Sequence, residues 1–286
     1  MATEFADSAA ATAPPPTLRQ TISRNFFDTI VSALRTFGRA VDVANQSVTG
    51  ACTDLVRGQF QWREALLQAW RLVTVTAIPA VLIAIPFGVI VSVQIGNLIH
   101  TLGADSLVGA AGGLGVIKQG APMATGFLLG GAGAAAIAAD LGARTIREEI
   151  DALNTMGINP IHRLVIPRMA AMLLVAPLLN ILIIFVGVLA GYAVAITGQG
   201  VTPGSYWATF GSFTQVADIW MSLLKAVIFG FLVVVIACQR GLEAKGGPRG
   251  VADGVNAAVV LSVVAIVVVN LVLTQVTAMF LPVRLA

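Results

Sequence analysis

This sequence has few charged residues for its length. Only 11% of its 286 residues are Asp, Glu, Lys or Arg, whereas a soluble domain has about 25%. The chain has two cysteines and two histidines, too few for a disulfide framework and without the spacing of a metal site. The net charge of +3 is too small to indicate a nucleic-acid partner. No Gly-x-x-x-x-Gly-Lys-Ser/Thr phosphate-binding loop occurs, so we expect no nucleotide on this chain.

Long apolar runs take the place of charge. About 20 apolar residues in a helix cross the hydrocarbon core of a bilayer. Five segments reach this length, and Lys225 is the one charge in them: 72–99, 119–139, 169–196, 219–239 and 254–283. Because a charge at mid-bilayer costs about 2.5–3.5 kcal/mol, these runs predict an all-α integral membrane protein with five transmembrane helices. We expect glycine-rich residues 101–118 and residues 197–218 to be connections between spans, with Tyr206 and Trp207 at the membrane interface.

Basic residues gather on one side of the predicted spans. All 17 Lys and Arg except Lys118, Lys225 and Arg284 precede the first span or lie in the second and fourth connections. The positive-inside rule places these segments in the cytoplasm. We therefore expect a multi-pass protein of the cell membrane with its N-terminus in the cytoplasm and its C-terminus outside.

The segment before the first span divides in two. Residues 1–17 have neither the basic start nor the apolar core of a signal peptide and are predicted to be a disordered cytoplasmic tail. In residues 18–71, apolar side chains recur at steps of three and four from Ile22 to Val41, among charged ones. This pattern predicts an amphipathic helix in the headgroup plane, followed by an elbow; a soluble helix on a partner is the alternative. Residues 72–286 form the five-span domain.

The most informative stretch, residues 143–168, reads ARTIREEIDALNTMGINPIHRLVIPR. One helical face is apolar and consists of Ile146, Ile150 and Leu153. The oppositely charged residues that stand four apart are Arg144 with Glu148 and Arg147 with Asp151. Gly157 and Pro160 end the pattern as a helix terminus does. We expect a short amphipathic cytoplasmic helix at about 143–160. The alternative is a solvated loop helix that binds no partner.

This stretch resembles the cytoplasmic signature of the MlaE/YrbE family of ABC-transporter permeases. The family pattern Glu-x-x-x-x-Leu-x-x-Met-x-[x]-x-Pro is met by Glu148 or Glu149, Leu153, Met156 and Pro160. Residues 139–142, Ala-Asp-Leu-Gly, are similar to the Ala-Glu-Ile/Leu-Gly that ends the second span in the family. The resemblance covers about residues 60–280 and is strongest to the A-type YrbE subunit of actinobacterial (mycobacterial) Mce systems.

The resemblance implies a permease subunit of an ATP-driven Mce-type lipid importer in the inner membrane. It implies a heterodimer with a second YrbE-type permease, two copies of a separate ABC ATPase that holds ATP and Mg²⁺, and Mce substrate-binding proteins. This chain would then bind no cofactor and carry no catalytic residue. The helix at 143–160 would be the coupling helix seated in the ATPase. Its coupling residues would be Arg144, Arg147, Glu148, Glu149, Asp151, Leu153, Met156, Gly157 and Pro160.

Two departures from the family pattern remove charge. Where the family has Arg-Glu-Leu-Gly-Pro before the second span, residues 118–122 read Lys-Gln-Gly-Ala-Pro. The family's Gly-Arg-Ala-Gly appears as Gly-Ala-Gly-Ala at residues 131–134. These losses suit a subunit whose non-identical partner carries the charges. Lys118, Gln119 and Lys225 are candidates for contact with a headgroup or partner. We expect Lys225 to snorkel toward the outer headgroups, with contact to an anionic headgroup or an Mce helix as the alternative.

A membrane interior almost without charge suits an acyl chain or a sterol better than an ion. We expect an apolar pocket for a fatty acid, sterol or phospholipid between the two permeases. Its predicted lining is Ile78, Leu82, Ile85, Phe87, Val259, Val263 and Ile266. The alternatives are an ion-coupled secondary transporter of a hydrophobic substrate, an intramembrane lipid enzyme, or an anchor for other subunits.

Overall fold

The computed structural model describes residues 36, 38–51, 53–54, 56, 58, 60–103 and 107–280, and within these ranges the chain is helical with short turns and no strand. The chain divides into two units, residues 1–42 and 43–286. In the first unit residues 38–42 are helical. The predicted tail at 1–17 and the predicted interfacial helix as far as residue 35 lie outside the described residues.

The second unit contains five helical segments long and apolar enough to cross a membrane. They are Trp62–Thr101, Val108–Ile146, Ile161–Gln199, Val216–Leu242 and Pro248–Met279. The predicted all-α membrane protein with five spans is therefore confirmed. Four long helices supply most of these spans: α3 (Trp62–Thr101), α8 (Ile166–Gln199), α10 (Val216–Leu242) and α11 (Pro248–Phe280). A single π-helical turn, η5 (Ile161–Val165), leads into α8.

The second span is built from five consecutive helical pieces. They are α4 (Val108–Ala111), the π-helical η3 (Gly112–Gly120), α5 (Ala121–Leu128), the π-helical η4 (Leu129–Gly133) and α6 (Ala134–Ile146). The helix thus begins at Val108, so the prediction that residues 101–118 form a connection is wrong from 108 onward. The reason lies in packing. A Cβ on Gly109 would stand 2.1 Å from the Tyr206 carbonyl oxygen, so glycine here permits contact between backbones rather than a loop.

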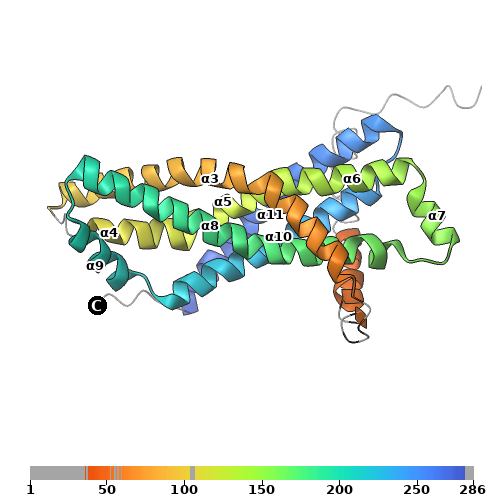
Figure 1. Cartoon of the computed structure of the whole chain (residues 1–286), viewed down its shortest axis with the longest axis horizontal. Coiled ribbons are helices and arrows are strands. Elements are labelled where there is room, and N and C mark those ends of the chain that lie inside the picture. The colour runs from red at the N-terminus through yellow and green to blue at the C-terminus, as the bar shows by residue number, and fades with distance from the viewer. Residues whose placement is uncertain are drawn as a thin grey trace, which may run out of the picture. The chain divides into compact units, whose positions relative to one another are not determined.

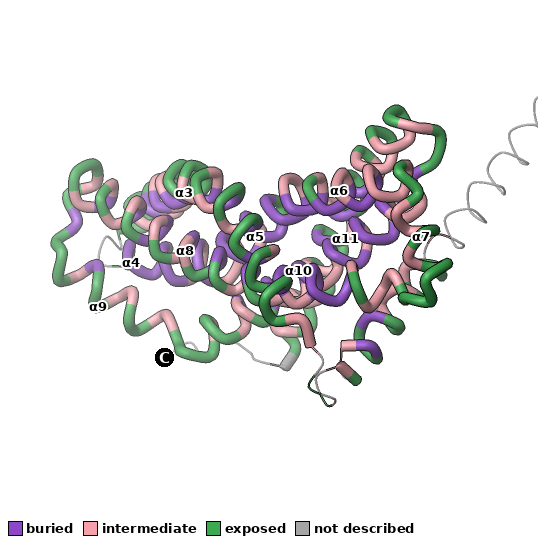
Figure 2. The backbone as a smooth tube through the Cα atoms, turned by 45° about the vertical axis from the view of Figure 1, so that its right-hand side comes forward, coloured by how far each residue is buried: buried purple, intermediate pink, exposed green. Residues whose placement is uncertain are grey.

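One helix pair and one group of three helices make up the core of the unit. α3 lies along α8 (Figure 1), and the two touch so closely that the Ser92 hydroxyl donates to the Gly191 carbonyl at 3.0 Å. α6, α10 and α11 pack together in the other half of the bundle. There Ile266, which is fully buried, fills the space beside Gly126 and Gly130. Buried residues lie on the faces that the helices turn toward one another, as Figure 2 shows.

Between α8 and α10 the chain forms a helix of its own, α9 (Pro203–Phe213). The predicted connection at 197–218 is therefore partly helical, because Thr202 caps the helix by accepting from the Ser205 amide and Pro203 occupies its first turn. Tyr206 is only 1% exposed and meets the Tyr192 ring edge-on at 5.2 Å. Tyr206 is therefore packed inside the protein, whereas Trp207 is 43% exposed, and the position of both at the membrane interface stays a prediction.

Candidate functional site

The predicted coupling segment, about residues 143–160, bends sharply at one end of the bundle; this bend is called the elbow below. α6 ends at Ile146, Glu148 adopts a left-handed backbone with φ 60°, and a new helix, α7, runs from Glu149 to Thr155. Gly157, with φ 76°, closes α7 together with the Ile158 amide, which donates to the Leu153 carbonyl at 2.9 Å. The single helix predicted at about 143–160 is therefore two helices joined by a break at Glu148. The predicted end at Gly157 is confirmed.

This break changes which charges pair. The expected pairs Arg144 with Glu148 and Arg147 with Asp151 are wrong, because the left-handed residue removes the helical register that they require. Glu149 takes both cations instead: its carboxylate lies 3.5 Å from Arg144 Nη1 and 3.1 Å from Arg147 Nε. Arg144 therefore ties α7 back to α6.

The ion pairs continue from the elbow into the spans. Arg144 Nε lies 3.4 Å from Asp140 Oδ1, and the other Asp140 oxygen accepts from Arg168. Arg168 is 3% exposed and also donates to the Leu164 carbonyl at 2.6 Å. A chain of charges thus runs from α7 through α6 to α8. Asp140 is a functional residue that sequence reasoning misses, although Asp140 and Arg168 lie at the ends of neighbouring spans on the same predicted membrane side.

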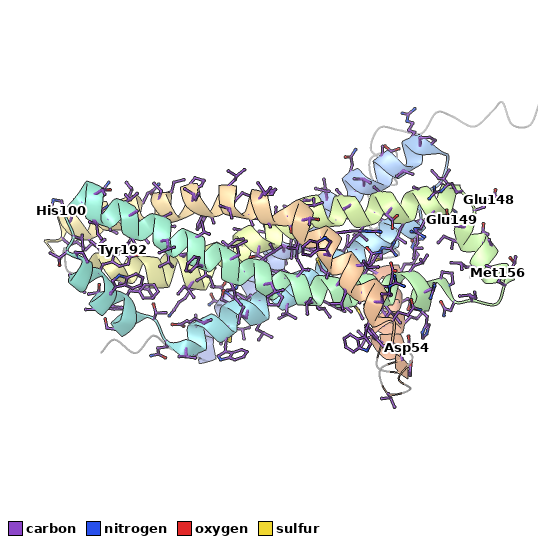
Figure 3. The ribbon with its side chains drawn as sticks, in the orientation of Figure 1. Asp54, His100, Glu148, Glu149, Met156 and Tyr192 are labelled. Atoms are coloured by element: carbon purple, nitrogen blue, oxygen red, sulfur yellow. The ribbon has the colours of Figure 1, made fainter. Side chains whose placement is uncertain are left out.

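The outer face of the elbow has no partner within the described residues. No residue of α7 is buried, and Met156, next in the chain, is 64% exposed. The side chains of Glu148 and Asp151 form no ion pair or hydrogen bond with the part of the chain that the structure describes. Figure 3 shows Glu148, Glu149 and Met156 at the tip of the bundle, far from His100 and Tyr192 at the opposite end. Of the predicted coupling carboxylates, Glu148 and Asp151 are therefore the ones available to a second protein.

A second polar site lies inside the bundle around Lys225 of α10. This side chain is 5% exposed, and its Nζ donates to Thr274 Oγ1 of α11 at 3.0 Å and to the Lys118 carbonyl of η3 at 3.4 Å. Gln119 donates to the same threonine at 3.3 Å. The expectation that Lys225 snorkels toward the headgroups is wrong, since its amine points between helices where two acceptors meet it. No carboxylate of the described chain lies within 4.0 Å of this amine.

Neighbouring groups leave this site short of partners. Lys118 is neutralised by Asp218 at 3.1 Å, so it does not share an anion with Lys225. The side-chain oxygen of Asn270, one helical turn before Thr274, is buried without a hydrogen-bond partner in the described chain. The carbonyl that receives Lys225 belongs to a π-helical stretch, and such stretches occur frequently at functional sites. The site thus holds a buried amine that meets neutral acceptors and no carboxylate of the described chain.

The predicted pocket residues do not meet in one cavity of this chain. On α3, Ile78 is 70%, Leu82 65% and Ile85 44% exposed, so they face away from the bundle. Phe87 instead packs on Gly120. On α11, Val259 and Val263 are half-buried, whereas Ile266 is fully buried against Gly126 and Gly130 and cannot line a pocket. For the exposed residues, a pocket shared with a second subunit stays a prediction.

Comparison with known proteins assigns the chain to a family. The sequence profile described as Permease MlaE matches residues 65–276. The chain belongs to the MlaE permease family. A protein of Synechocystis named as a probable ABC transporter permease is 31% identical over 183 residues, which cover 64% of this chain and 70% of that protein. The MlaE permease protein of the intermembrane phospholipid transport system of Haemophilus influenzae is 24% identical over 257 residues, 88% of this chain and 97% of that one.

A plant protein belongs to the same group of relatives. The chloroplastic protein TRIGALACTOSYLDIACYLGLYCEROL 1 of Arabidopsis thaliana is 26% identical over 221 residues, 77% of this chain and 63% of the plant protein. The matched region of this MlaE-family permease spans all five apolar helices. It includes the elbow and Lys225.

No group of three His, Cys, Asp or Glu residues that could hold a metal occurs among the described residues.

Proposed function

We propose that this MlaE-family permease is the transmembrane subunit of an ATP-driven Mce-type lipid transporter, with α7 seated in a separate ABC ATPase. The observation that carries this proposal is the elbow. α7 has no buried residue. Glu149 nevertheless holds it to the end of the second span, because Arg144 pairs with both Glu149 and Asp140. A helix exposed to a partner but held firmly to the spans suits the transfer of movement.

The ion-pair chain gives this transfer a route. Asp140 accepts from Arg144 and from Arg168 at once, so a displacement of α7 acts on α6 and α8 together. Arg168 is almost fully buried, and a buried cation cannot leave its carboxylate without a large desolvation cost. Binding and hydrolysis of ATP with Mg²⁺ on the ATPase would thereby move the second and third spans.

The Lys225 site indicates the substrate class. A buried amine that lacks a carboxylate favours an anionic ligand, and Gln119 and Asn270 add polar groups nearby. The exposed apolar residues of α3 and α11 would hold the acyl chains between two permeases. We therefore propose a lipid with an anionic head, such as a fatty acid or a phospholipid, in preference to a sterol.

The finer assignments rest on the family resemblance. The chain would be an A-type YrbE subunit that pairs with a non-identical permease, because it lacks charges at 119 and 132 that the family pattern carries. Mce proteins would continue the lipid path outside the membrane, and transport would run inward. The α7 end would face the cytoplasm, as the basic residues around it predict.

Purification from native membranes tests the assembly. We expect the tagged chain to bring along an ABC ATPase, a second permease and Mce proteins, all identified by mass spectrometry with the bound lipid. Glu148→Lys combined with Met156→Asp should lose the ATPase and keep the second permease. Ser212→Lys, an exposed position on α9 at the opposite end, serves as the control and should keep both. A wild-type chain that purifies alone contradicts the proposal.

The buried Lys225 also favours a second candidate, an ion-coupled secondary transporter of a hydrophobic substrate, because intramembrane ionisable groups often serve as proton relays. In that case lipid movement would follow a proton gradient and continue without ATP. Proteoliposomes that contain the chain alone, given a pH gradient, separate the two candidates. Lipid movement under these conditions supports the secondary transporter, and its absence supports the ATP-driven permease.

A further inference from the structure

The turn between α10 and α11 forms a hollow with the elbow. A cavity of about 440 Å³ opens between residues 145–151 and residues 242–247. Its apolar part is made by Ile146, Ile150, Leu242 and Ala244, and two carboxylates, Glu148 and Asp151, stand among them. Cavities of about 300–1,000 Å³ hold drug-sized ligands, so this one has room for more than one side chain of a partner.

Close packing holds the two walls of this hollow in place. The Thr145 hydroxyl donates to the Gly241 carbonyl at 3.2 Å, which joins α6 to the end of α10. A Cβ on Gly241 would come within 2.7 Å of the Leu141 Cβ, so the helices touch at this level. Such tight contact leaves little freedom between the walls. The hollow therefore exists before any partner binds.

Glycine fixes the far wall. Gly246 and Gly247 have φ values of 82° and 80°, a left-handed backbone that other residues rarely adopt. A Cβ on Gly250 would lie 1.7 Å from the Lys245 carbonyl oxygen, so the turn folds back tightly on itself. Lys245, Gly246 and Gly247 of this turn line the hollow.

The charge of the hollow is incomplete. Glu149 engages Arg144 and Arg147, which leaves Glu148 and Asp151 without a cation among the described residues. Lys245 is the one cation in the lining, so the hollow is acidic overall. An apolar floor beside unpaired carboxylates complements a segment that carries an apolar side chain next to Lys or Arg.

We propose that this hollow is the second half of the ATPase docking surface and receives such an apolar and basic segment of the ATPase. The inference rests on the proposed function, because the hollow shares Glu148, Ile150 and Asp151 with the elbow. Its consequence goes further. Leu242 ends α10 and the turn leads directly into α11, so the ATPase would act on the fourth and fifth spans as well as on the second and third.

Site-specific photocrosslinking in the purified complex tests the hollow. A benzophenone side chain is placed at Lys245 on the turn, at Met156 beside α7, and at Arg249, which is exposed but outside the hollow. We expect crosslinks to the ATPase from positions 245 and 156 and none from 249. A crosslink from 156 without one from 245 overturns the hollow and leaves the proposed function standing. A complex without any ATPase overturns both.

A charge reversal adds a second readout. Asp151→Lys should weaken ATPase retention by about tenfold, since it places a cation where a basic partner side chain binds. Asp253→Lys makes the same charge change at an exposed α11 position outside the hollow and should leave retention unchanged. Equal retention by the Asp151 variant and the wild type overturns the inference.

Discussion

The crossing of α3 and α8 at Gly88 gives a quantitative test of the packing. A Cβ on Gly88 would lie 2.1 Å from the carbonyl oxygen of Gly187 and 2.8 Å from its carbonyl carbon. Ordinary contact begins at 3.4 Å, so in Gly88→Ala the helices must separate by roughly 1 Å, against the close packing of interiors. The obstructing atoms are backbone, and no rotamer change relieves them. We therefore expect a cost of about 3 kcal/mol, the upper end for overpacking.

Thermal unfolding of the detergent-purified chain measures this cost. At about 2–4 °C per kcal/mol for chains of this size, Gly88→Ala should lower the melting temperature by about 6–12 °C. Gly131→Ala is the matched control, because a Cβ there meets nothing within 4 Å; the gain in helix propensity should keep its melting temperature at or above that of the wild type. If Gly88→Ala melts together with the wild type, the α3–α8 packing described above is wrong.

Three side chains provide further tests. Asp140→Asn leaves Arg168, which is 3% exposed, without its carboxylate; because Asp140 itself is 43% exposed, we expect about 1–3 kcal/mol rather than the full cost of a broken buried pair, and an unchanged melting temperature contradicts the pairing. Lys225→Met should keep the fold but lose co-purified anionic lipid, and a variant with an unchanged lipid complement refutes the assignment. Burial raises the pKa of Tyr206 from 10.0 to about 12. The neutral Tyr206 side chain therefore contributes fully to the stability of the folded state below pH 10, and this contribution is lost as the pH rises toward 12. In an ultraviolet titration of Tyr192→Phe, ionisation at the ordinary pKa in the folded protein contradicts the burial.

The five spans can be predicted from the sequence, because a long apolar run without charge is visible in the composition of each segment. The predicted start of the second span is wrong because the start depends on tertiary contacts. Glycine in a sequence indicates a turn, but Gly109 and Gly113 are helical and permit close contact with α9 and the residue that follows it. A Cβ on Gly113 would stand 2.0 Å from the hydroxyl oxygen of Thr214, directly after α9. Only the tertiary structure distinguishes a glycine that turns the chain from one that lets two backbones touch.

The functional residues divide in the same way. The helix end at Gly157 follows from local sequence, since glycine accepts the left-handed conformation that closes α7. The break at Glu148 does not, because a non-glycine residue with positive φ is uncommon and held in place by its surroundings. The direction of Lys225 depends on Thr274, 49 residues away. Spacing along one helix cannot reveal such a partner.

One measurement tests the central claim most directly: ATP-dependent movement of a labelled anionic lipid by the complex purified through this chain and reconstituted in liposomes. We predict movement with Mg²⁺ and ATP, none with a non-hydrolysable analogue, and strongly reduced movement with Asp140→Asn while ATP hydrolysis continues. Lipid movement that ignores ATP and follows an ion gradient would contradict the account.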